Sequence, residues 1–338
     1  MNLVICFFLF AAFALLWTWP SALCATQTNR TLHVKPAHAL ARNFYHESCP
    51  RAHEIIRSQI VKVIKQNPSE AAGLLRTMFH DCFVQGCDAS ILLMGPMLSE
   101  QFAAPNMRSL RPSTNLIIDH IKAQLEAACP DVVSCADTLV LSAAIAVQLV
   151  GGPHIPVLLG RRDSSSAASV QTVVANLPSP QFNIFGLKQK FRSHGLNSKD
   201  LVALSGAHTF GHAHCRIVGL QLTPRVSADL DIDFAANLSR ICLPANNPAN
   251  GAATVHLDFI THDRFNNNYY KNVLNKVALF HSDAALLEAP DTKDLVQRYA
   301  KNEEEFFEQF KVSMLKLSEI GVLTGKNGVI RKKCSVSN

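Results

Sequence analysis

The stretch of sequence that decides the fold reads LRTMFHDCFVQGCDAS, from Leu75 to Ser90. It continues a predicted helix that begins with NPSE at residues 67–70, where Asn suits the N-cap, Pro the first helical position and Glu the third. Arg76 and His80 are four residues apart, so their side chains share one face of this helix. A guanidinium beside an imidazole lowers the pKa of the imidazole and keeps it neutral, as a general base requires. Surface neighbours have the same spacing, so the pair alone leaves both interpretations open.

The second half of this stretch concentrates polar groups in a short loop. Asp81, Asp88 and Ser90 supply two carboxylates and a hydroxyl, and a disulfide between Cys82 and Cys87 can close the loop. Hard oxygen ligands in a pinned loop suit Ca²⁺. A polar turn closed by a disulfide accounts for the same residues equally well, so the spacing supports both interpretations.

A second informative stretch reads LVALSGAHTFGHAHC, from Leu201 to Cys215. Leu201, Leu204 and His208 follow helical spacing, which predicts that His208 points toward the interior with the apolar side chains. A buried histidine needs partners for its ring nitrogens, either a carbonyl in the core or a metal that it ligates. His208 and His212 have a spacing that can begin a zinc site, but the glutamate of an HExxH motif is absent, and so is a GxSxG nucleophile elbow. Hydrolase interpretations are therefore disfavoured.

Helical periodicity dominates the rest of the chain. Apolar residues at helical spacing predict amphipathic helices over residues 114–128 and 303–317. Residues 137–150 are apolar on most faces, as in a central buried helix, and a Gly-Gly-Pro run ends it. Strand patterns are few and short, and loops are indicated at residues 164–169 and 244–251. We therefore predict a mainly α fold with about ten helices and no linker that separates independent domains.

The composition indicates a globular protein. Its 338 residues are 48% hydrophobic and 17% charged, which argues against disorder, collagen and coiled coil. The chain carries 32 Lys and Arg against 26 Asp and Glu, a formal net charge of +6, yet it has no run of four basic residues. This diffuse charge argues against nucleic-acid binding and favours contact with acidic polysaccharide or another anionic surface.

The N-terminus has the features of a secretory signal peptide. Residues 1–25 contain no charged side chain, carry a long apolar run and end in small residues, which predicts cleavage near Cys24 or Ala25. An uncleaved membrane anchor is the alternative, because the apolar run is long and no basic residue precedes it. Residues 26–41 then form an N-terminal extension, and residues 42–338 form the folded domain.

Eight cysteines remain after removal of the signal, an even number that suggests four disulfides in a secreted chain. Their pairing does not follow from spacing alone, and no pair has the CxxC spacing of a zinc ribbon. Asn29 and Asn237 each begin an Asn-x-Ser/Thr sequon, which agrees with passage through a glycosylating compartment.

Taken together, these stretches resemble the secretory plant (class III) haem peroxidases, from about Arg42 to Cys334. The resemblance rests on ordered blocks: NFYxxxCP at residues 43–50, LRxxFHDCFVxGCDAS at 75–90, VSCAD at 133–137, LGRRD at 159–163, NLPSP at 176–180 and DLVALSGAHT at 200–209. It implies a two-part helical fold with one haem b between a distal and a proximal helix. It also implies a secreted enzyme that reduces H₂O₂ and oxidises phenolic donors by one-electron steps.

The resemblance also assigns catalytic roles. His80 would act as general base and then as general acid toward H₂O₂, and Arg76 would stabilise the charge that develops as the O–O bond breaks. Asn106 matches the hydrogen-bond partner of the distal histidine. On the other side of the haem, His208 would be the axial iron ligand, and Asp283 would accept its Nδ1 proton.

Two Ca²⁺ sites, a substrate contact and a set of disulfides are implied in the same way. The distal Ca²⁺ ligands would come from Asp81, Val84, Gly86, Asp88, Ser90 and, through water, Glu100. The proximal ligands would come from Thr209, Asp258, Thr261, Arg264 and Asn266. Pro178 matches a substrate contact at the haem edge. The implied disulfides are Cys49–Cys129, Cys82–Cys87, Cys135–Cys334 and Cys215–Cys242.

Several positions depart from the family pattern. Ser69 stands where an arginine is common, so a basic partner for a haem propionate is missing from that position. Met78, His214 and Leu257 replace residues that are often His, Gln and aromatic, respectively, which predicts altered haem affinity or redox tuning. Asn266 replaces a usual Asp and removes a negative charge, which predicts that the proximal Ca²⁺ binds more weakly than the distal one.

The resemblance implies a monomer that is located outside the cell, in the cell wall or in the vacuole, and that takes part in the response to oxidative stress. Its partners would be H₂O₂, small phenolic donors and acidic wall polysaccharide. Two alternatives come from other classes of protein. One is a protein that keeps the fold and binds wall polymer without turnover, and the other is a zinc enzyme that uses His208, His212 and His214.

Overall fold

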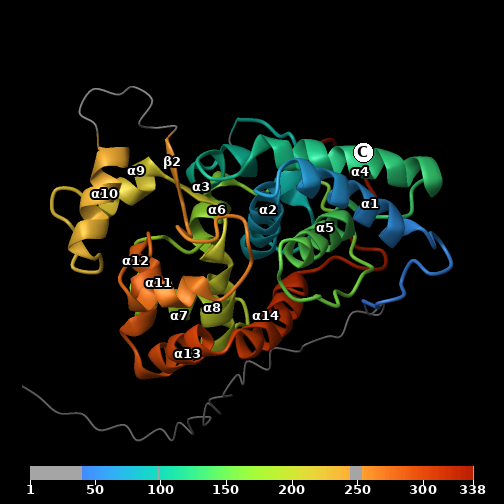
Figure 1. The fold of residues 1–338 in the computed structure, drawn as a ribbon. Coiled ribbons are helices and arrows are strands. Elements are labelled where there is room, and N and C mark those ends of the chain that lie inside the picture. Colours follow the sequence, from blue (N-terminus) through green and yellow to red (C-terminus); the bar gives the residue numbers. More distant parts are fainter. Residues whose placement is uncertain (1–39, 98, 244–252, 338) are drawn as a thin grey trace, which may run out of the picture. The chain divides into compact units, whose positions relative to one another are not determined.

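The computed structural model describes residues 40–97, 99–243 and 253–337 (Figure 1). The predicted signal peptide, nearly all of the N-terminal extension, the sequon at Asn29 and the predicted loop at 244–251 lie outside the described residues. Fourteen α-helices and two short strands occur in the described part, so the predicted mainly α fold is confirmed. The helices outnumber the predicted ten partly because three of them are single turns of four residues.

The first half of the described chain holds six α-helices and two 3₁₀ turns. They are α1 (Ala52–Gln66), α2 (Glu70–Val84), η1 (Ser90–Leu92), η2 (Glu100–Phe102), α3 (Ala104–Met107), α4 (Pro112–Ala128), α5 (Cys135–Leu149) and α6 (Val170–Asn176).

The second half holds the other α-helices, three more 3₁₀ turns and both strands. They are α7 (Ile184–Ser193), α8 (Ser198–Ser205), η3 (Gly206–Thr209), β1 (His212–His214), α9 (Cys215–Val218), η4 (Gly219–Gln221), α10 (Ile232–Cys242), β2 (Thr254–His256), α11 (Asn268–Leu274), α12 (His281–Ala284), η6 (Ala285–Leu287), α13 (Pro290–Lys301) and α14 (Glu303–Ser318). The strands pair antiparallel, with His212 opposite His256.

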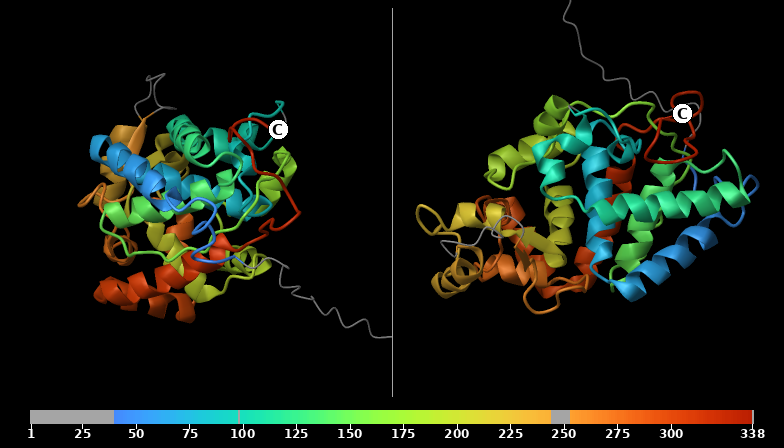
Figure 2. Two further views of the ribbon diagram at one scale, coloured as in Figure 1. Left: turned by 90° about the vertical axis from the view of Figure 1, so that its right-hand side faces the viewer. Right: turned by 90° about the horizontal axis from the view of Figure 1, so that it is seen from above.

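The longer helices pack in two groups. In the first, α5 lies against α1, α2 and α4, and these helices run side by side in the views of Figures 1 and 2. In the second, α8 contacts α7, α13 and α14, and α13 also packs on α11. α14 touches α2 and so joins the two groups. The two strands, α9 and α10 contribute to a smaller hydrophobic core of their own.

α5 is the central buried helix because its sequence has no polar face. Every residue from Cys135 to Val147 is buried. Ser134 caps the first turn by accepting a hydrogen bond of 3.0 Å from the backbone N–H of Asp137. Gly151, with φ of 102°, follows the last turn in a left-handed conformation that favours glycine. The helix predicted over residues 137–150 is therefore observed, and it begins two residues earlier than predicted.

A buried ion pair ties α5 to the rest of the fold. Asp137 Oδ1 accepts a hydrogen bond of 2.8 Å from the Arg161 guanidinium, and both side chains are buried. Asp137 Oδ2 accepts a second bond of 2.7 Å from the Tyr45 hydroxyl. Arg161 Nε also donates to the carbonyl of Ser318, at the end of α14, over 2.9 Å. One carboxylate thus connects α5, α14 and the segment before α1.

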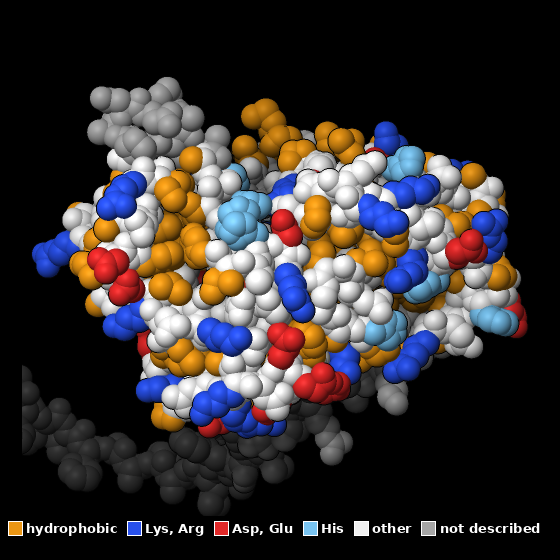
Figure 3. All heavy atoms as spheres, viewed as in Figure 1, with side chains coloured by type: hydrophobic (Ala, Val, Ile, Leu, Met, Phe, Trp, Pro, Cys, Tyr) orange, Lys and Arg blue, Asp and Glu red, His pale blue; other side chains and the backbone are white. Residues whose placement is uncertain are grey.

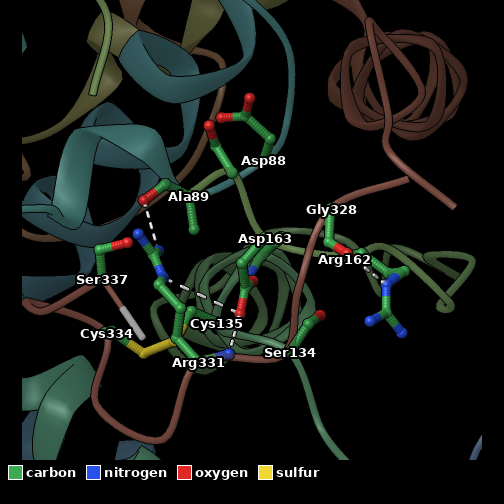
Figure 4. Close-up of polar contacts among 12 residues, drawn as sticks. Asp88, Ala89, Ser134, Cys135, Arg162, Asp163, Gly328, Arg331, Cys334 and Ser337 are labelled. Atoms are coloured by element: carbon green, nitrogen blue, oxygen red, sulfur yellow. Dashed lines mark hydrogen bonds and ion pairs between the residues drawn. A yellow bond between two sulfur atoms is a disulfide. The ribbon is translucent and has the colours of Figure 1, made fainter. Parts of the chain in front are cut away.

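Figure 4 shows a second buried network, around Asp163 and Arg331. Asp163 accepts hydrogen bonds of 2.9 Å from two backbone N–H groups, one near the start of α5 and one of Arg331 itself. The Arg331 side chain is fully buried and donates to the Ala89 carbonyl over 2.7 Å. The Cys135–Cys334 disulfide lies in the same view. The C-terminal segment is therefore held to both α5 and the loop that follows α2.

The structure joins all eight cysteines of the described part in disulfides. The pairs are Cys49–Cys129, Cys82–Cys87, Cys135–Cys334 and Cys215–Cys242, and they match those that the resemblance implies. They close loops of very different length, with sequence separations of 80, 5, 199 and 27 residues. In a chain-entropy account, the longest loop restricts the unfolded chain most, and the shortest mainly shapes its own turn.

Charged side chains are mixed on the face drawn in Figure 3. Lys and Arg are scattered over this face, with Asp and Glu between them, and they form no single basic stripe there. The sequon residue Asn237 is exposed on α10, where its side-chain oxygen accepts a hydrogen bond from Arg240. In the part of the chain that the structure describes, no helix has the length and apolar character needed to cross a bilayer.

The Asp137–Arg161 pair gives a testable prediction for the fold. Asp137→Asn leaves the buried Arg161 guanidinium without a counter-charge, so we expect the free energy of unfolding in urea to fall by about 3–5 kcal/mol. Arg51→Gln is the control, because Arg51 and Glu54 form an exposed ion pair with about 70% of each side chain accessible. We expect a change within about 0.5 kcal/mol for this control. Equal losses in the two variants would contradict the central role of the buried pair.

Candidate active site

The two informative stretches of sequence meet at one cavity. This cavity has a volume of about 490 Å³ and lies between α2 and the turn η3. Arg76 and His80 line it from α2, and His208 lines it from η3. Most of the remaining lining side chains are apolar. An apolar cavity with a few converging polar groups is typical of a cofactor or substrate site.

His80 is positioned by a hydrogen bond from its ring. Its Nδ1 lies 2.6 Å from Asn106 Oδ1, and the amide nitrogen of Asn106 donates to the Glu100 carbonyl over 2.8 Å. The Asn106 oxygen therefore accepts, and His80 carries its proton on Nδ1. Burial and the nearby Arg76 lower the pKa of His80 well below its ordinary value. The imidazole is thus neutral at physiological pH and keeps the lone pair on Nε2 free to accept a proton.

Arg76 lies beside His80, and within the described residues no hydrogen bond or ion pair engages its guanidinium. Its exposed surface faces the cavity, and the surrounding protein shields the guanidinium from bulk solvent. Burial within the protein lowers the pKa of Arg76 to about 10, so the guanidinium stays charged at neutral pH. A charged donor next to a neutral base can stabilise negative charge as it develops on a bound substrate.

His208 is oriented by a carboxylate. Its Nδ1 lies 2.8 Å from Asp283 Oδ1, which also accepts a bond of 2.9 Å from the Tyr269 hydroxyl. The backbone N–H of Phe280 donates to the other Asp283 oxygen over 3.2 Å. With Nδ1 engaged in this way, Nε2 is the nitrogen of His208 that is free to bind a metal in the cavity, and the carboxylate strengthens it as a donor.

The spacing of Leu201, Leu204 and His208 predicts that His208 lies on an α-helix, but the structure places it just beyond the end of one. α8 ends at Ser205, and His208 lies in the 3₁₀ turn η3. Tertiary contacts explain the change: the Tyr270 hydroxyl donates to the Val202 carbonyl over 3.0 Å, and a Cβ on Gly206 would lie 2.4 Å from the same hydroxyl. The chain therefore tightens at a glycine that packs directly against a neighbouring aromatic ring.

The start of α2 also differs from the prediction. The predicted helix begins at Pro68, whereas the observed α-helix begins at Glu70. Residues 67–70 form a turn in which Asn67 Oδ1 accepts from the Ser69 N–H over 3.2 Å, and the Asn67 amide donates to Glu70 over 3.1 Å. The two side chains interact as in the predicted capping box, but the backbone enters the helix two residues later.

Arg111 lies beside the serine that replaces a common arginine. Its guanidinium donates to Ser69 Oγ over 2.8 Å and to His212 Nδ1 over 3.1 Å, and it lines the cavity. Burial, the neighbouring His256 and Arg111 lower the pKa of His212 to about 4, so this imidazole is neutral and accepts the bond. This arrangement is not predictable from local sequence, because 42 residues separate Arg111 from Ser69.

His214 leaves a polar atom without a partner at the same cavity. It lines the cavity, and its Nδ1 is buried with no hydrogen bond among the described residues. This unpartnered nitrogen, the facing histidines His80 and His208 and the guanidinium of Arg111 fit a large, mostly apolar ligand that has a metal at its centre and anionic groups at its edge. Haem has these properties.

The three histidines of the zinc alternative do not converge on a common point. His208 Nδ1 is paired with Asp283, and His212 Nδ1 accepts from Arg111. The His212 ring packs on His256, with 4.2 Å between ring centroids. Within the described ranges, no group of three or more His, Cys, Asp or Glu side chains is placed to hold a metal ion. A metal ion bound to the described part of the chain would therefore need backbone carbonyls, hydroxyls, water or a cofactor as additional ligands.

The distal loop carries three buried carboxylates, and the guanidinium of Arg331 is near enough to offset only part of their charge. Asp81 is held by the backbone N–H groups of Ala89 and Ile91, and Asp88 by that of Ser90. Burial raises the pKa of Asp81 well above its ordinary value, and the nearby Asp88 and Glu100 add to the rise.

Burial also raises the pKa of Asp88, and it raises that of Glu100 to about 7. Ser90 Oγ and Glu100 Oε1 are both buried, and neither makes a hydrogen bond of standard geometry among the described residues. The Ser90 hydroxyl is nevertheless close enough to Glu100 to lower the pKa of this carboxyl and so offset part of the effect of burial. Crowded, buried oxygens of this kind fit a bound divalent cation, with backbone carbonyls completing its coordination.

The proximal cluster is different, because its carboxylate is already hydrogen-bonded. Asp258 accepts from the Thr261 hydroxyl, from two backbone N–H groups and from the amides of Asn268 and Asn272. Burial raises the pKa of Asp258, but these hydrogen bonds outweigh it and the net shift is downward. Asn266 Oδ1 accepts from the Thr209 hydroxyl over 3.0 Å. The charge of Asp258 is stabilised by the chain itself, so this cluster needs a cation less than the distal loop does.

Comparison with known proteins agrees with this geometry. The family model described as "Peroxidase" matches residues 56–302. The chain is 42% identical to Peroxidase 12 of Arabidopsis thaliana, over 88% of this chain and 83% of that protein. It is 42% identical to Peroxidase 15 of Arabidopsis thaliana, over 87% and 88% of the two chains. It is 43% identical to the cationic peroxidase SPC4 of Sorghum bicolor, over 89% and 83%.

The raised pKa of Glu100 predicts that cation binding at the distal loop is linked to pH. A divalent cation favours the charged carboxylate, so binding should release protons near pH 7, and the affinity for Ca²⁺ should rise as the pH increases through about 7. Calorimetric titration with Ca²⁺ in buffers of different ionisation enthalpy measures the released protons. Glu100→Gln should bind Ca²⁺ more weakly and release fewer protons. Equal proton release in wild type and variant would show that Glu100 does not respond to the cation.

Proposed function

The chain belongs to the peroxidase family and is therefore an enzyme that acts on H₂O₂, and we propose that it is a secreted haem peroxidase. In this proposal it oxidises phenolic donors by one-electron steps. The observation that carries the proposal is the pair of histidines on opposite walls of one cavity, each with Nδ1 held by a partner. His80 is held by Asn106 and His208 by Asp283, over 2.6 and 2.8 Å. The two Nε2 atoms are then free for different tasks.

His208 and Arg111 would hold the haem. His208 Nε2 would ligate the iron, and Asp283 would keep the opposite nitrogen protonated. Arg111 would pair with a haem propionate in place of the arginine that is missing at Ser69, and His214 would offer its unpartnered nitrogen to the same edge. When bound, haem supplies the redox centre that takes two oxidising equivalents from H₂O₂ and passes them on singly.

The distal residues would move the protons. The free Nε2 of His80 accepts a proton from H₂O₂ and then delivers it to the departing oxygen, which leaves as water. Asn106 keeps the Nδ1 proton in place, so the same nitrogen of His80 serves in both steps. Arg76 donates to the oxygen atoms as negative charge develops on them. The low pKa of His80 keeps it ready as a base even in weakly acidic surroundings.

The remaining assignments follow from the family and from the charge of the chain. We place the predicted signal at residues 1–25 and the folded domain at residues 42–338, with export to the cell exterior, the cell wall or the vacuole. The two sequons would carry glycans, and the protein would act as a monomer. The net charge of +6 supports association with acidic wall polysaccharide. Pro178 lines the cavity, which supports its role as a contact for phenolic donors.

The proposed roles of His80 and Arg76 give a kinetic prediction. His80→Ala removes the group that serves both proton transfers, so the rate of reaction with H₂O₂ should fall by about 10³-fold or more. Arg76→Leu should slow it by about 10²- to 10³-fold. Stopped-flow absorbance of the haem-loaded proteins measures both rates.

The control for these variants is His120→Ala, which removes an exposed histidine of α4. This variant should react at the wild-type rate. Near-normal peroxide reaction in either active-site variant would disprove the assignment. Haem binding in the wild type without oxidation of guaiacol would favour instead a wall-binding protein without turnover.

The difference between the two cation clusters gives a prediction about calcium. We propose that the chain holds one Ca²⁺ tightly in the distal loop and another weakly at the proximal cluster, where Asn266 replaces a carboxylate. Metal analysis during chelator titration should show that one ion is lost at about tenfold or more lower chelator concentration than the other. Asn266→Asp should bring the two steps together by adding a charged ligand. If this substitution changes neither the Ca²⁺ content nor the haem spectrum, the proposed weak proximal site is wrong.

A further inference from the structure

The wall of the cavity carries an excess of positive charge. Three arginines line it, namely Arg76, Arg108 and Arg111, and Asp283 is the single carboxylate among the described lining residues. Asp283 is 2% exposed and accepts two side-chain hydrogen bonds, so it does not neutralise guanidinium groups elsewhere on the wall. Such a cavity attracts anionic ligands.

The three arginines have different surroundings. Arg76 lies beside His80 in the interior, where the proposed peroxide chemistry takes place. Arg111 is engaged with Ser69 and His212, and its side chain also lies 3.9 Å from Glu70. Arg108 is exposed, and in the part of the chain that the structure describes no hydrogen bond or ion pair engages its guanidinium. Arg76 and Arg108 both lack a hydrogen-bond or ion-pair partner among the described residues, but Arg76 lies beside His80, where the peroxide would react. Arg108 is therefore the arginine that remains to pair with a donor molecule.

Arg108 lies on the side of the cavity where we place the phenolic donor. It directly follows α3, and α3 packs against α6. Pro105 of α3, Val174 of α6 and Pro178 just after α6 all line the same cavity. Val174 is 61% exposed, so an apolar surface reaches from the cavity to solvent close to an unpaired cation. This combination complements a ligand with an aromatic ring and an anionic group.

We infer that Arg108 makes the enzyme selective for phenolic donors that carry a carboxylate, such as hydroxyphenylalkanoic and hydroxycinnamic acids. The inference rests on the proposed function, because it names the donor class that the same site oxidises. The ring lies against the apolar surface of Pro105, Val174 and Pro178, and the carboxylate pairs with the Arg108 guanidinium, whose fork of N–H groups matches two carboxylate oxygens. The phenol loses one electron and one proton, as in any peroxidase donor, and the carboxylate is unchanged.

Two donors that differ only in this charge test the inference. They are 3-(4-hydroxyphenyl)propionic acid, which is ionised at pH 6, and its neutral methyl ester. At low ionic strength the haem-loaded wild type should show a kcat/KM for the acid that is about three- to tenfold higher than for the ester, since partly exposed ion pairs contribute modestly. Added salt of 0.5 M should reduce this ratio toward one.

The variants separate a local contact from the general field of the protein. Arg108→Gln should reduce the ratio to about one and leave kcat/KM for the ester and the haem spectrum unchanged, whereas Arg108→Lys should keep part of the preference. Arg192→Gln is the control, because Arg192 is exposed on α7 and does not line this cavity. It removes the same charge from the molecule and should leave the ratio as in the wild type.

Each contrary result has a distinct meaning. Equal loss of the preference in Arg108→Gln and Arg192→Gln would assign the preference to net charge and overturn the inference. Loss of haem from Arg108→Gln would assign Arg108 to the cofactor and overturn it as well. A wild type that oxidises the ester without preferring the acid would disprove the donor selectivity and leave the proposed peroxidase function standing. A wild type that oxidises neither donor would overturn both.

Discussion

His80 and His208, on opposite walls of the cavity, must each present a chosen nitrogen, and their hydrogen-bond partners meet this constraint. His80 and His208 both have Nδ1 fixed by an acceptor, but the acceptors differ in charge. The neutral amide of Asn106 orients His80 and raises the pKa of the imidazole, but burial and the nearby Arg76 outweigh this effect and keep the pKa low. The carboxylate of Asp283 orients His208 and increases its strength as a ligand. In the proposed function, one residue type thus serves as a base on one wall and as a metal ligand on the other.

Buried charges, as well as apolar packing, hold the scaffold of the fold together. Asp137 of α5 pairs with Arg161. Asp163 accepts a hydrogen bond from the backbone N–H of Arg331 near the distal loop (Figure 4). Arg331 then fixes the carbonyl of Ala89, a non-glycine residue with φ of 59°. An unusual backbone conformation next to crowded carboxylates persists only where neighbouring contacts enforce it. The distal loop is therefore pre-shaped by the C-terminal segment, to which a disulfide adds a covalent link.

The sequence predicted those helices whose formation depends on the spacing of apolar and charged residues within the helix itself. The apolar run of α5, the acidic start of α14 and the shared face of Arg76 and His80 all follow from helical periodicity, and the structure contains those helices within about two residues. The break before His208 was not predictable in this way, because it arises from the packing of Gly206 against Tyr270. Disulfide pairing came from the family resemblance, since eight cysteines allow many pairings.

The position of Arg111 shows the same limit and has a larger consequence. In the sequence, Ser69 stands where the family commonly has an arginine, so a positive charge is missing at that position. In the structure, the guanidinium of Arg111, the residue before α4, lies 2.8 Å from the Ser69 hydroxyl. A ligand in the cavity responds to the position of a charge, not to the element that carries it, so an arginine on a different element can act on the same ligand. By this argument Arg111 can pair with a carboxylate of the cofactor, while Arg108 is exposed and no hydrogen bond or ion pair engages its guanidinium within the described residues. An unpaired charge at an apolar entrance is most simply explained by selection of the molecules that enter.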